Sequence, residues 1–161
     1  MHALTSSLWT TPPGTGHFPL FVVLLVPTLL IVVGLVNSHL SGWASLAQRY
    51  RYDEGYSGER LRFRSAAMRY WGRFGNCLTM GANPHGFFLA MSVPLFPGFP
   101  PLFIPWNEIC LRRGRFLWTK YVELRLGREP AIPLRISQRL ASRLAALAGG
   151  AWPREPATGV R

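Results

Sequence analysis

Cysteine is scarce in this chain of 161 residues, which contains only Cys77 and Cys110, far apart in the sequence. There is no Cys-x-x-Cys pair and no Cys/His spacing of the kind that binds zinc. A domain in the cytoplasm keeps such side chains as thiols, because that compartment is reducing. We therefore expect no metal site, no cofactor and no disulfide bond.

Basic residues are absent from the first 48 positions, and all 18 of them follow, with Lys120 the sole lysine among arginines. A cleaved signal peptide needs a basic segment before its apolar run, so this absence argues against one. Small residues from Ser41 to Ser45 resemble a cleavage site, which keeps cleavage as the alternative to a permanent anchor. The net charge of +11 lies beyond residue 48, and a domain so charged is drawn to anionic surfaces such as the inner leaflet.

Charge is also missing from residues 18–36, where Thr28 is the only polar side chain. About 20 apolar residues are enough to cross the hydrocarbon core of a bilayer. Pro27 and Gly34 are poor choices for a soluble helix but are tolerated in bilayer helices. The sequence therefore predicts a transmembrane helix over 18–40.

The orientation of this helix follows from the one-sided distribution of arginine. Arginines close to one end of a membrane span are retained on the cytoplasmic side, and here they begin only after the span. We expect a single-pass protein of the inner (cytoplasmic) membrane. Residues 1–17 form a short non-cytoplasmic tail, the N-terminus lies outside, and the C-terminal domain lies in the cytoplasm.

Residues 41–60 are expected to form a juxtamembrane linker that lies against the bilayer. Aromatic rings favour the membrane interface because one end is apolar and the other is polar. The aromatic residues of this stretch are Trp43, Tyr50, Tyr52 and Tyr56. The adjacent acids Asp53 and Glu54 are not read as a catalytic pair, because neighbouring side chains on an exposed turn point apart.

Beyond residue 60 the pattern changes to alternating short strands. The predicted strands cover 61–71, 76–82, 87–93, 102–106, 107–113, 115–127 and 131–137. The proline-rich stretch 94–101 cannot be a central strand, since proline donates no ladder hydrogen bond, and is expected to be a stiff loop. Gly114 is expected to close a hairpin, and the alternation places Lys120 on the inner face unless the strand ends or bulges there.

The last regular element is an amphipathic helix over 137–148, with Ser137 as its N-cap and two glycines at its end. Its apolar stripe consists of Leu140, Ala141, Leu144, Leu147 and Ala148. The stripe predicts a helix that lies on a sheet. Residues 150–161 lack periodicity and are expected to be disordered.

This order of anchor, antiparallel strands and closing helix resembles the bacterial pleckstrin-homology-like domains. The resemblance covers residues 61–149 and rests on "LFIPWNEI", the hairpin "CLRRGRFLWTKYVELRLG", "AIPLRIS" and the helix. It implies a bent antiparallel sheet closed by a C-terminal amphipathic helix, which binds or scaffolds rather than catalyses. In lipid-binding members, basic residues on early strand loops hold phosphorylated head groups, and Arg69 and Arg73 are the nearest equivalents by position.

Three functions remain open from the sequence. The first is a membrane-tethered binding or scaffold module on the cytoplasmic face, with the bilayer, anionic lipids or another membrane protein as partner. The second is an anionic-lipid sensor that uses the arginine-rich surface, for which the candidate contacts are Arg49, Arg51, Arg69 and Arg73. The third is a thiol hydrolase with Cys77 as nucleophile and His85 as base. Nucleic acid is not expected as a partner, because the arginines are scattered and no binding motif is present.

The stretch around Trp106 is interpreted as architectural. Trp106 follows an extended apolar segment and is expected in the core, and Glu108 is expected to pair with an arginine or cap a turn. A catalytic Glu108 would need a partner base or nucleophile, and the sequence offers none.

Overall fold

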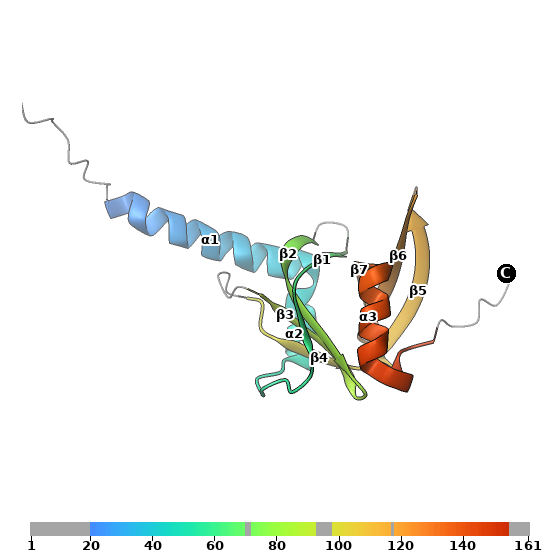
Figure 1. Ribbon diagram of the computed structural model, residues 1–161. Coiled ribbons are helices and arrows are strands. Elements are labelled where there is room, and N and C mark those ends of the chain that lie inside the picture. The colour runs from blue at the N-terminus through green and yellow to red at the C-terminus, as the bar shows by residue number, and fades with distance from the viewer. Residues whose placement is uncertain (1–19, 70–71, 93–97, 117, 155–161) are drawn as a thin grey trace, which may run out of the picture.

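A computed structural model describes residues 20–69, 72–92, 98–116 and 118–154. Within these ranges one long helix, α1 (Leu20–Ser41), projects from a curled, mainly β domain (Figure 1). The predicted tail over 1–17, the end of the C-terminal tail over 155–161 and half of the predicted stiff loop (94–97 of 94–101) lie outside the described residues.

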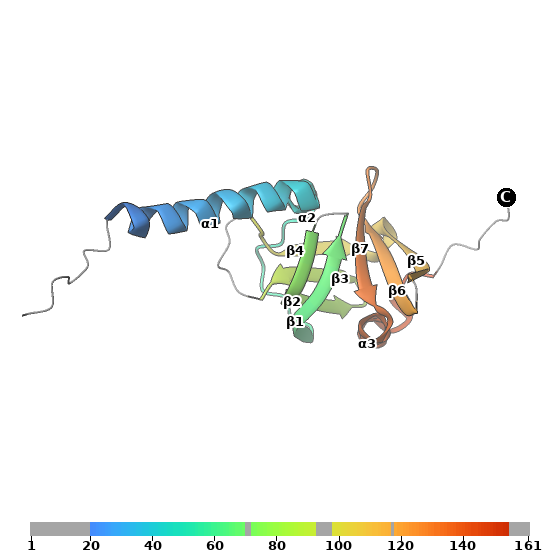
Figure 2. The same ribbon diagram turned by 90° about the horizontal axis from the view of Figure 1, so that it is seen from above.

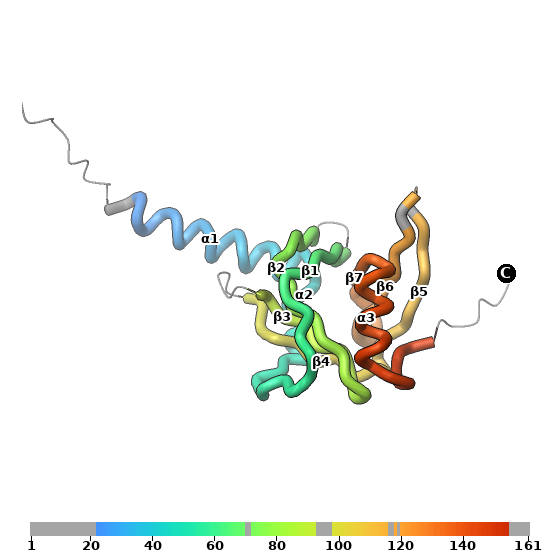
Figure 3. Tube along the Cα trace, in the orientation of Figure 1, coloured from blue at the N-terminus to red at the C-terminus, as the bar shows by residue number. Residues whose placement is uncertain are grey.

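Helix α1 is apolar over almost its whole surface. All but two of the large apolar side chains that are exposed in the described part of the chain belong to it. Residues Val22–Ser41 are long and apolar enough to cross a membrane, and a signal sequence would have the same properties. Pro27 lies inside the helix. The predicted helix over 18–40 is thus confirmed as a helix from residue 20, where the described part of the chain begins, and Figure 3 shows it extending away from the strands.

Helix α1 ends at Gly42, whose φ of +83° is a left-handed conformation that favours glycine. A second helix, α2 (Trp43–Tyr50), then enters the domain. Trp43 is 0% exposed, and its ring lies 5.3 Å from that of Phe99 and 6.0 Å from that of Phe74, between centroids. Its indole N–H donates to the carbonyl oxygen of Pro100 at 3.0 Å.

The interpretation that the aromatic residues of 41–60 lie at the membrane interface is therefore wrong for three of the four. Trp43, Tyr50 and Tyr56 are buried inside the domain, and the ring of Tyr56 stacks on Phe88 at 4.5 Å. Aromatic residues beside a membrane span fit an interfacial belt and a protein core equally well in the sequence. Tertiary packing decided between the two.

Seven strands follow and form one antiparallel sheet. They are β1 (Arg60–Met68), β2 (Gly72–Asn83), β3 (Gly86–Met91), β4 (Leu102–Pro105), β5 (Ile109–Phe116), β6 (Thr119–Leu126) and β7 (Ile132–Ser137), with a short 3-10 turn at Trp106–Glu108. Their order in the sheet is β4-β3-β2-β1-β7-β6-β5. Figure 2 shows the sheet curling into a half-barrel. The expected bent antiparallel sheet is confirmed at this level.

Two strand details differ from the sequence expectation, and a third agrees with an exception that the sequence allowed. Strand β2 begins at Gly72 rather than at residue 76, since it pairs with β1 from its first residue. Gly114 does not close a hairpin but pairs with Tyr121 inside the β5–β6 ladder, which continues to Phe116 and Thr119. Lys120 lies close to that end of the ladder and is exposed, as a strand end there allows.

Helix α3 (Gln138–Ala148) closes one end of the half-barrel and packs against β2, β6 and β7. The Ser137 hydroxyl accepts a hydrogen bond from the backbone N–H of Leu140 at 3.3 Å, which confirms the predicted N-cap. Leu144 is 0% exposed. The chain does not become irregular at residue 150, because a 3-10 turn covers Gly149–Ala151 and the Trp152 ring then packs 5.4 Å from Trp106.

The architectural reading of the stretch around Trp106 holds with one correction. Trp106 is half-buried rather than fully buried, and its indole N–H donates to the carbonyl oxygen of Asn83 at 2.8 Å. Glu108 pairs with Arg128 at 3.3 Å, as expected of an acid that joins a neighbouring arginine. Glu108 also accepts a hydrogen bond from the Tyr50 hydroxyl, which fastens α2 to this turn.

Candidate functional site

Cys77 and His85 lie at opposite ends of the β2–β3 hairpin. The carbonyl oxygen of Cys77 accepts from the backbone N–H of Ser92 at the open end, and His85 lies in the turn beyond the last pair, Asn83 and Gly86. A strand rises about 3.4 Å per residue, so roughly 20 Å separates the two residues. The structure therefore does not bring together the nucleophile and base that the thiol hydrolase alternative requires.

Burial also raises the pKa of the Cys77 thiol, which lowers its thiolate fraction at neutral pH. Cys110 is exposed on β5. We expect a thiol-reactive probe to label Cys110 several-fold faster than Cys77 in the folded chain, measured by mass spectrometry of timed samples. Labelling both in denaturant should abolish the difference. Faster labelling of Cys77 in the folded state would contradict the assignment of its thiol as structural.

The four arginines proposed from the sequence do not form one site. Arg51 pairs with Asp53 at 2.9 Å on the surface. Arg49 is exposed on α2, and Arg73 is exposed on β2. Only Arg69, half-buried at the end of β1, borders a basic hollow in the domain surface.

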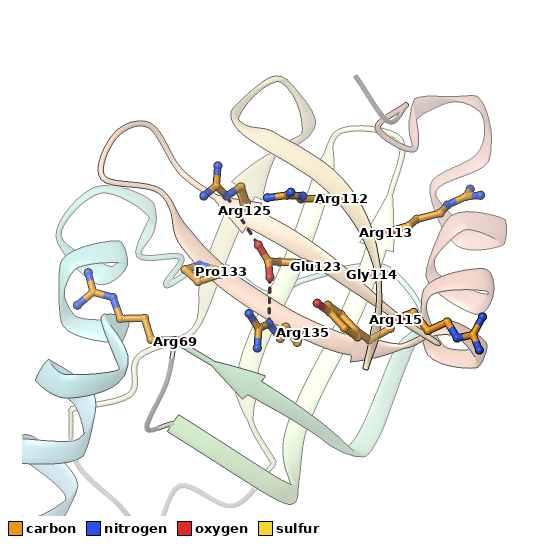
Figure 4. Close-up of a pocket in the computed structure, with 10 residues that line it drawn as sticks. Arg69, Arg112, Arg113, Gly114, Arg115, Glu123, Arg125, Pro133 and Arg135 are labelled. Carbon is orange, nitrogen blue, oxygen red and sulfur yellow. Dashed lines mark hydrogen bonds and ion pairs between the residues drawn. The ribbon is translucent and has the colours of Figure 1, made fainter. Parts of the chain in front are cut away.

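That hollow lies on the face of β5, β6 and β7 that points away from the core (Figure 4). Leu111, Val122 and Leu124 point inward and are buried, so the residues that alternate with them face outward. Six arginines line the hollow, and we call them the arginine cluster. They are Arg69, Arg112, Arg113, Arg115, Arg125 and Arg135.

The strand register brings the central members of the cluster together around Glu123. Arg112 on β5 pairs across the ladder with Glu123 on β6, and Glu123 pairs in turn with Arg135 on β7. Arg125 lies two residues farther along β6, on the same face. In Figure 4, Arg112, Arg125 and Arg135 surround the carboxylate of Glu123, whereas Arg113 and Arg115 extend away from it.

Glu123 is 8% exposed, and among the described residues it is the only acid that lines the hollow. Its carboxylate accepts from the Arg135 Nε at 2.9 Å and lies 3.8 Å from the Arg125 Nε. The Arg135 guanidinium also lies 5.3 Å from the centre of the Tyr121 ring. The carboxylate and the ring therefore hold Arg135 in place.

Short residues leave space between the long arginine side chains. Pro133 pairs with Arg125 across β6 and β7. The carbonyl oxygen of Pro133 accepts a hydrogen bond from the backbone N–H of Arg69 at 3.0 Å. Pro133 thus separates these two arginines without filling the gap. On the other side, a Cβ on Gly114 would clash with the Tyr121 ring, so glycine allows the ring to lie across β5. The resulting hollow has a volume of about 450 Å³.

The chemistry of this hollow is that of anion binding. Arg113 and Arg115 have the strand parity of the inward-facing Leu111 and extend away, so four guanidinium groups and one carboxylate share the outward face, with a net charge of +3 (four minus one). Arginine remains protonated in proteins and pairs with carboxylate or phosphate through two parallel hydrogen bonds. Neither a histidine nor a cysteine lines the hollow, and no group of His, Cys, Asp and Glu suited to a metal ion occurs among the described residues.

Sequence reasoning found Arg69 and missed the rest of the cluster. The available signal was the alternation of arginine with apolar residues in β5, β6 and β7, which places Arg112, Arg125 and Arg135 on the outer face. Alternation does not reveal which residues of different strands stand side by side.

No family model, curated protein or solved structure matches the chain.

Proposed function

We propose that this chain is a single-pass membrane protein whose β domain is a pleckstrin-homology-like binding module on the cytoplasmic face. The observation that carries the proposal is α1, an apolar helix that exposes its side chains to its surroundings along most of its length. Such a surface is unfavourable in water and favourable in lipid. Arginine follows the helix and does not precede it, which favours an external N-terminus.

The strand order supports the pleckstrin-homology-like assignment. Strands β1 to β4 form one antiparallel meander, β5 to β7 form another, and β1 joins them by pairing with β7. Helix α3 then closes one end of the curled sheet. A half-barrel closed by one C-terminal helix is the architecture that the resemblance implies, and a binding role follows from it as a proposal.

The domain is attached to α1 without a flexible connection. The Ser38 hydroxyl, near the end of α1, donates to the carbonyl oxygen of Gly98 at 2.5 Å, and Trp43 is enclosed in the core one residue after the helix break. At 1.5 Å per residue, the 22 residues of α1 span about 33 Å, close to the roughly 30 Å of a hydrocarbon core. In the proposed arrangement, this connection holds the domain at the membrane surface.

Reporter fusions test the proposed topology. A fluorescent protein at the C-terminus should fluoresce, and a phosphatase that is active only outside the cytoplasm should be inactive at the same position. The matched control places each reporter at the N-terminus, where the phosphatase should be active. The opposite pattern would contradict the cytoplasmic location of the β domain, and release of a soluble, shortened chain would identify α1 as a cleaved signal.

A second candidate function is that of an anionic-lipid sensor, and the position of Arg69 favours it. A Cβ on Gly42, the residue that separates α1 from α2, would lie 3.1 Å from the Arg69 Nε. The arginine cluster therefore begins beside the end of the proposed membrane span. Each basic group near an anionic leaflet contributes about 1 kcal/mol to binding.

A further inference from the structure

We propose that the arginine cluster binds a ligand carrying two or more closely spaced phosphate groups, and that the Glu123 carboxylate occupies this site when the ligand is absent. The inference deepens the proposed binding function and rests on it for the side of the membrane on which the ligand is found. The site is built from three adjacent strands and the end of a fourth, so the backbone positions of its arginines are fixed by strand pairing.

The spacing of the arginines calls for more than one anionic group. Arg112 and Arg135 stand on either side of β6, two strand spacings or about 10 Å apart at the backbone. Arg125 lies farther along β6, and Arg69 lies beyond Pro133. A single small anion engages only part of this set. Linked phosphates reach several guanidinium groups, and each planar fork matches two phosphate oxygens.

Glu123 sets a threshold for what can bind. Its one carboxylate already engages Arg125 and Arg135, so a ligand must offer these arginines more than a carboxylate does. A ligand with a single carboxylate would replace the ion pairs of Glu123 with equivalent ion pairs, so it would gain little binding free energy. A polyphosphate releases Glu123, pairs with the arginines it held, and also engages Arg112. The hollow of about 450 Å³ lies within the usual range for small ligands, about 300–1,000 Å³.

The test uses the full chain in detergent, titrated with inorganic tripolyphosphate by calorimetry. Glu123→Gln removes the competing charge and keeps the shape, so it should tighten binding about tenfold. Arg112→Gln should weaken binding about tenfold or more, because it removes a charged fork from the ligand. The matched control is Arg143→Gln on the exposed side of α3, which removes the same charge away from the cluster and should change the affinity less than twofold.

Several results would overturn the proposal. These are unchanged or weaker binding by a folded Glu123→Gln variant, an equal loss for Arg112→Gln and Arg143→Gln, or no binding by the unmodified chain. Glu123 is buried and paired, so its substitution risks unfolding. Arg112 is exposed, so the Arg112→Gln variant is expected to fold. If Glu123→Gln does not fold, the affinity of Arg112→Gln for tripolyphosphate decides the test.

A second arm distinguishes a lipid head group from a soluble phosphate compound. The full chain is placed in nanodiscs of zwitterionic lipid, with or without cardiolipin, whose head group carries two phosphates. Because Arg69 lies beside the end of α1, we expect cardiolipin to weaken tripolyphosphate binding about tenfold by competition, and to have little effect on Arg112→Gln. An unchanged affinity would exclude this head group as the source. The detergent titration does not depend on topology. The reporter fusions can therefore contradict the proposed topology while tripolyphosphate binding supports this inference. Equally, the titration can contradict this inference while the reporter fusions support the topology.

Discussion

Leu144→Asp unfolds the β domain. Leu144 is 0% exposed on the inner side of α3, and in the part of the chain that the structure describes no basic residue is buried among the core residues around it. Losing a buried leucine alone costs about 2–5 kcal/mol, and an unpaired buried carboxylate adds a further penalty. The sum approaches the roughly 5–15 kcal/mol that stabilises a typical domain. We expect rapid digestion by protease and loss of the tryptophan fluorescence shift of the folded chain in detergent.

The matched control is Arg143→Asp, one residue away on the exposed side of the same helix. It introduces the same side chain and removes a charge, yet it places the carboxylate in water. Surface changes of this kind typically alter stability by no more than about 0.5 kcal/mol. Equal protease sensitivity of the two variants would show that α3 does not pack on the sheet through Leu144.

Trp43→Ala lowers the melting temperature of the full chain by about 6–20 °C. Truncating a buried tryptophan costs about 3–5 kcal/mol, and 1 kcal/mol corresponds to about 2–4 °C in a domain of this size. The substitution also removes the hydrogen bond to Pro100 and the ring contacts with Phe74 and Phe99. Thermal unfolding in detergent, followed by circular dichroism in the near ultraviolet, measures the loss.

Trp118→Ala provides the control, because Trp118 is 90% exposed near the end of the β5–β6 ladder. Its removal should shift the melting temperature by less than about 2 °C. If Trp43→Ala were as mild as Trp118→Ala, Trp43 would lie at the membrane interface, as its position after an apolar run suggests from the sequence. The two variants therefore decide between a core residue and an interfacial one.

The arginine cluster illustrates where reasoning from the sequence stops. Each outward-facing arginine of β5, β6 and β7 is identifiable from strand alternation alone. Their meeting around Glu123 depends on the antiparallel register, in which Arg112, Glu123 and Arg135 occupy one row across three strands. A shift of one residue would send these side chains to the opposite face. The contact between β1 and β7, which adds Arg69 to the hollow, joins residues far apart in the chain.

By itself, the sequence determined the features that depend on local pattern. These are the long apolar helix, the succession of short strands, and the closing helix with its Ser137 cap and Leu144 stripe, because side-chain periodicity and capping are read over a few residues. Only the tertiary structure decided that Trp43 is core, that Cys77 and His85 lie apart, and that the arginines surround one buried acid. Each of these depends on strand pairing or packing between distant segments, whose energies are summed over the whole domain and leave no signature in a short stretch of sequence.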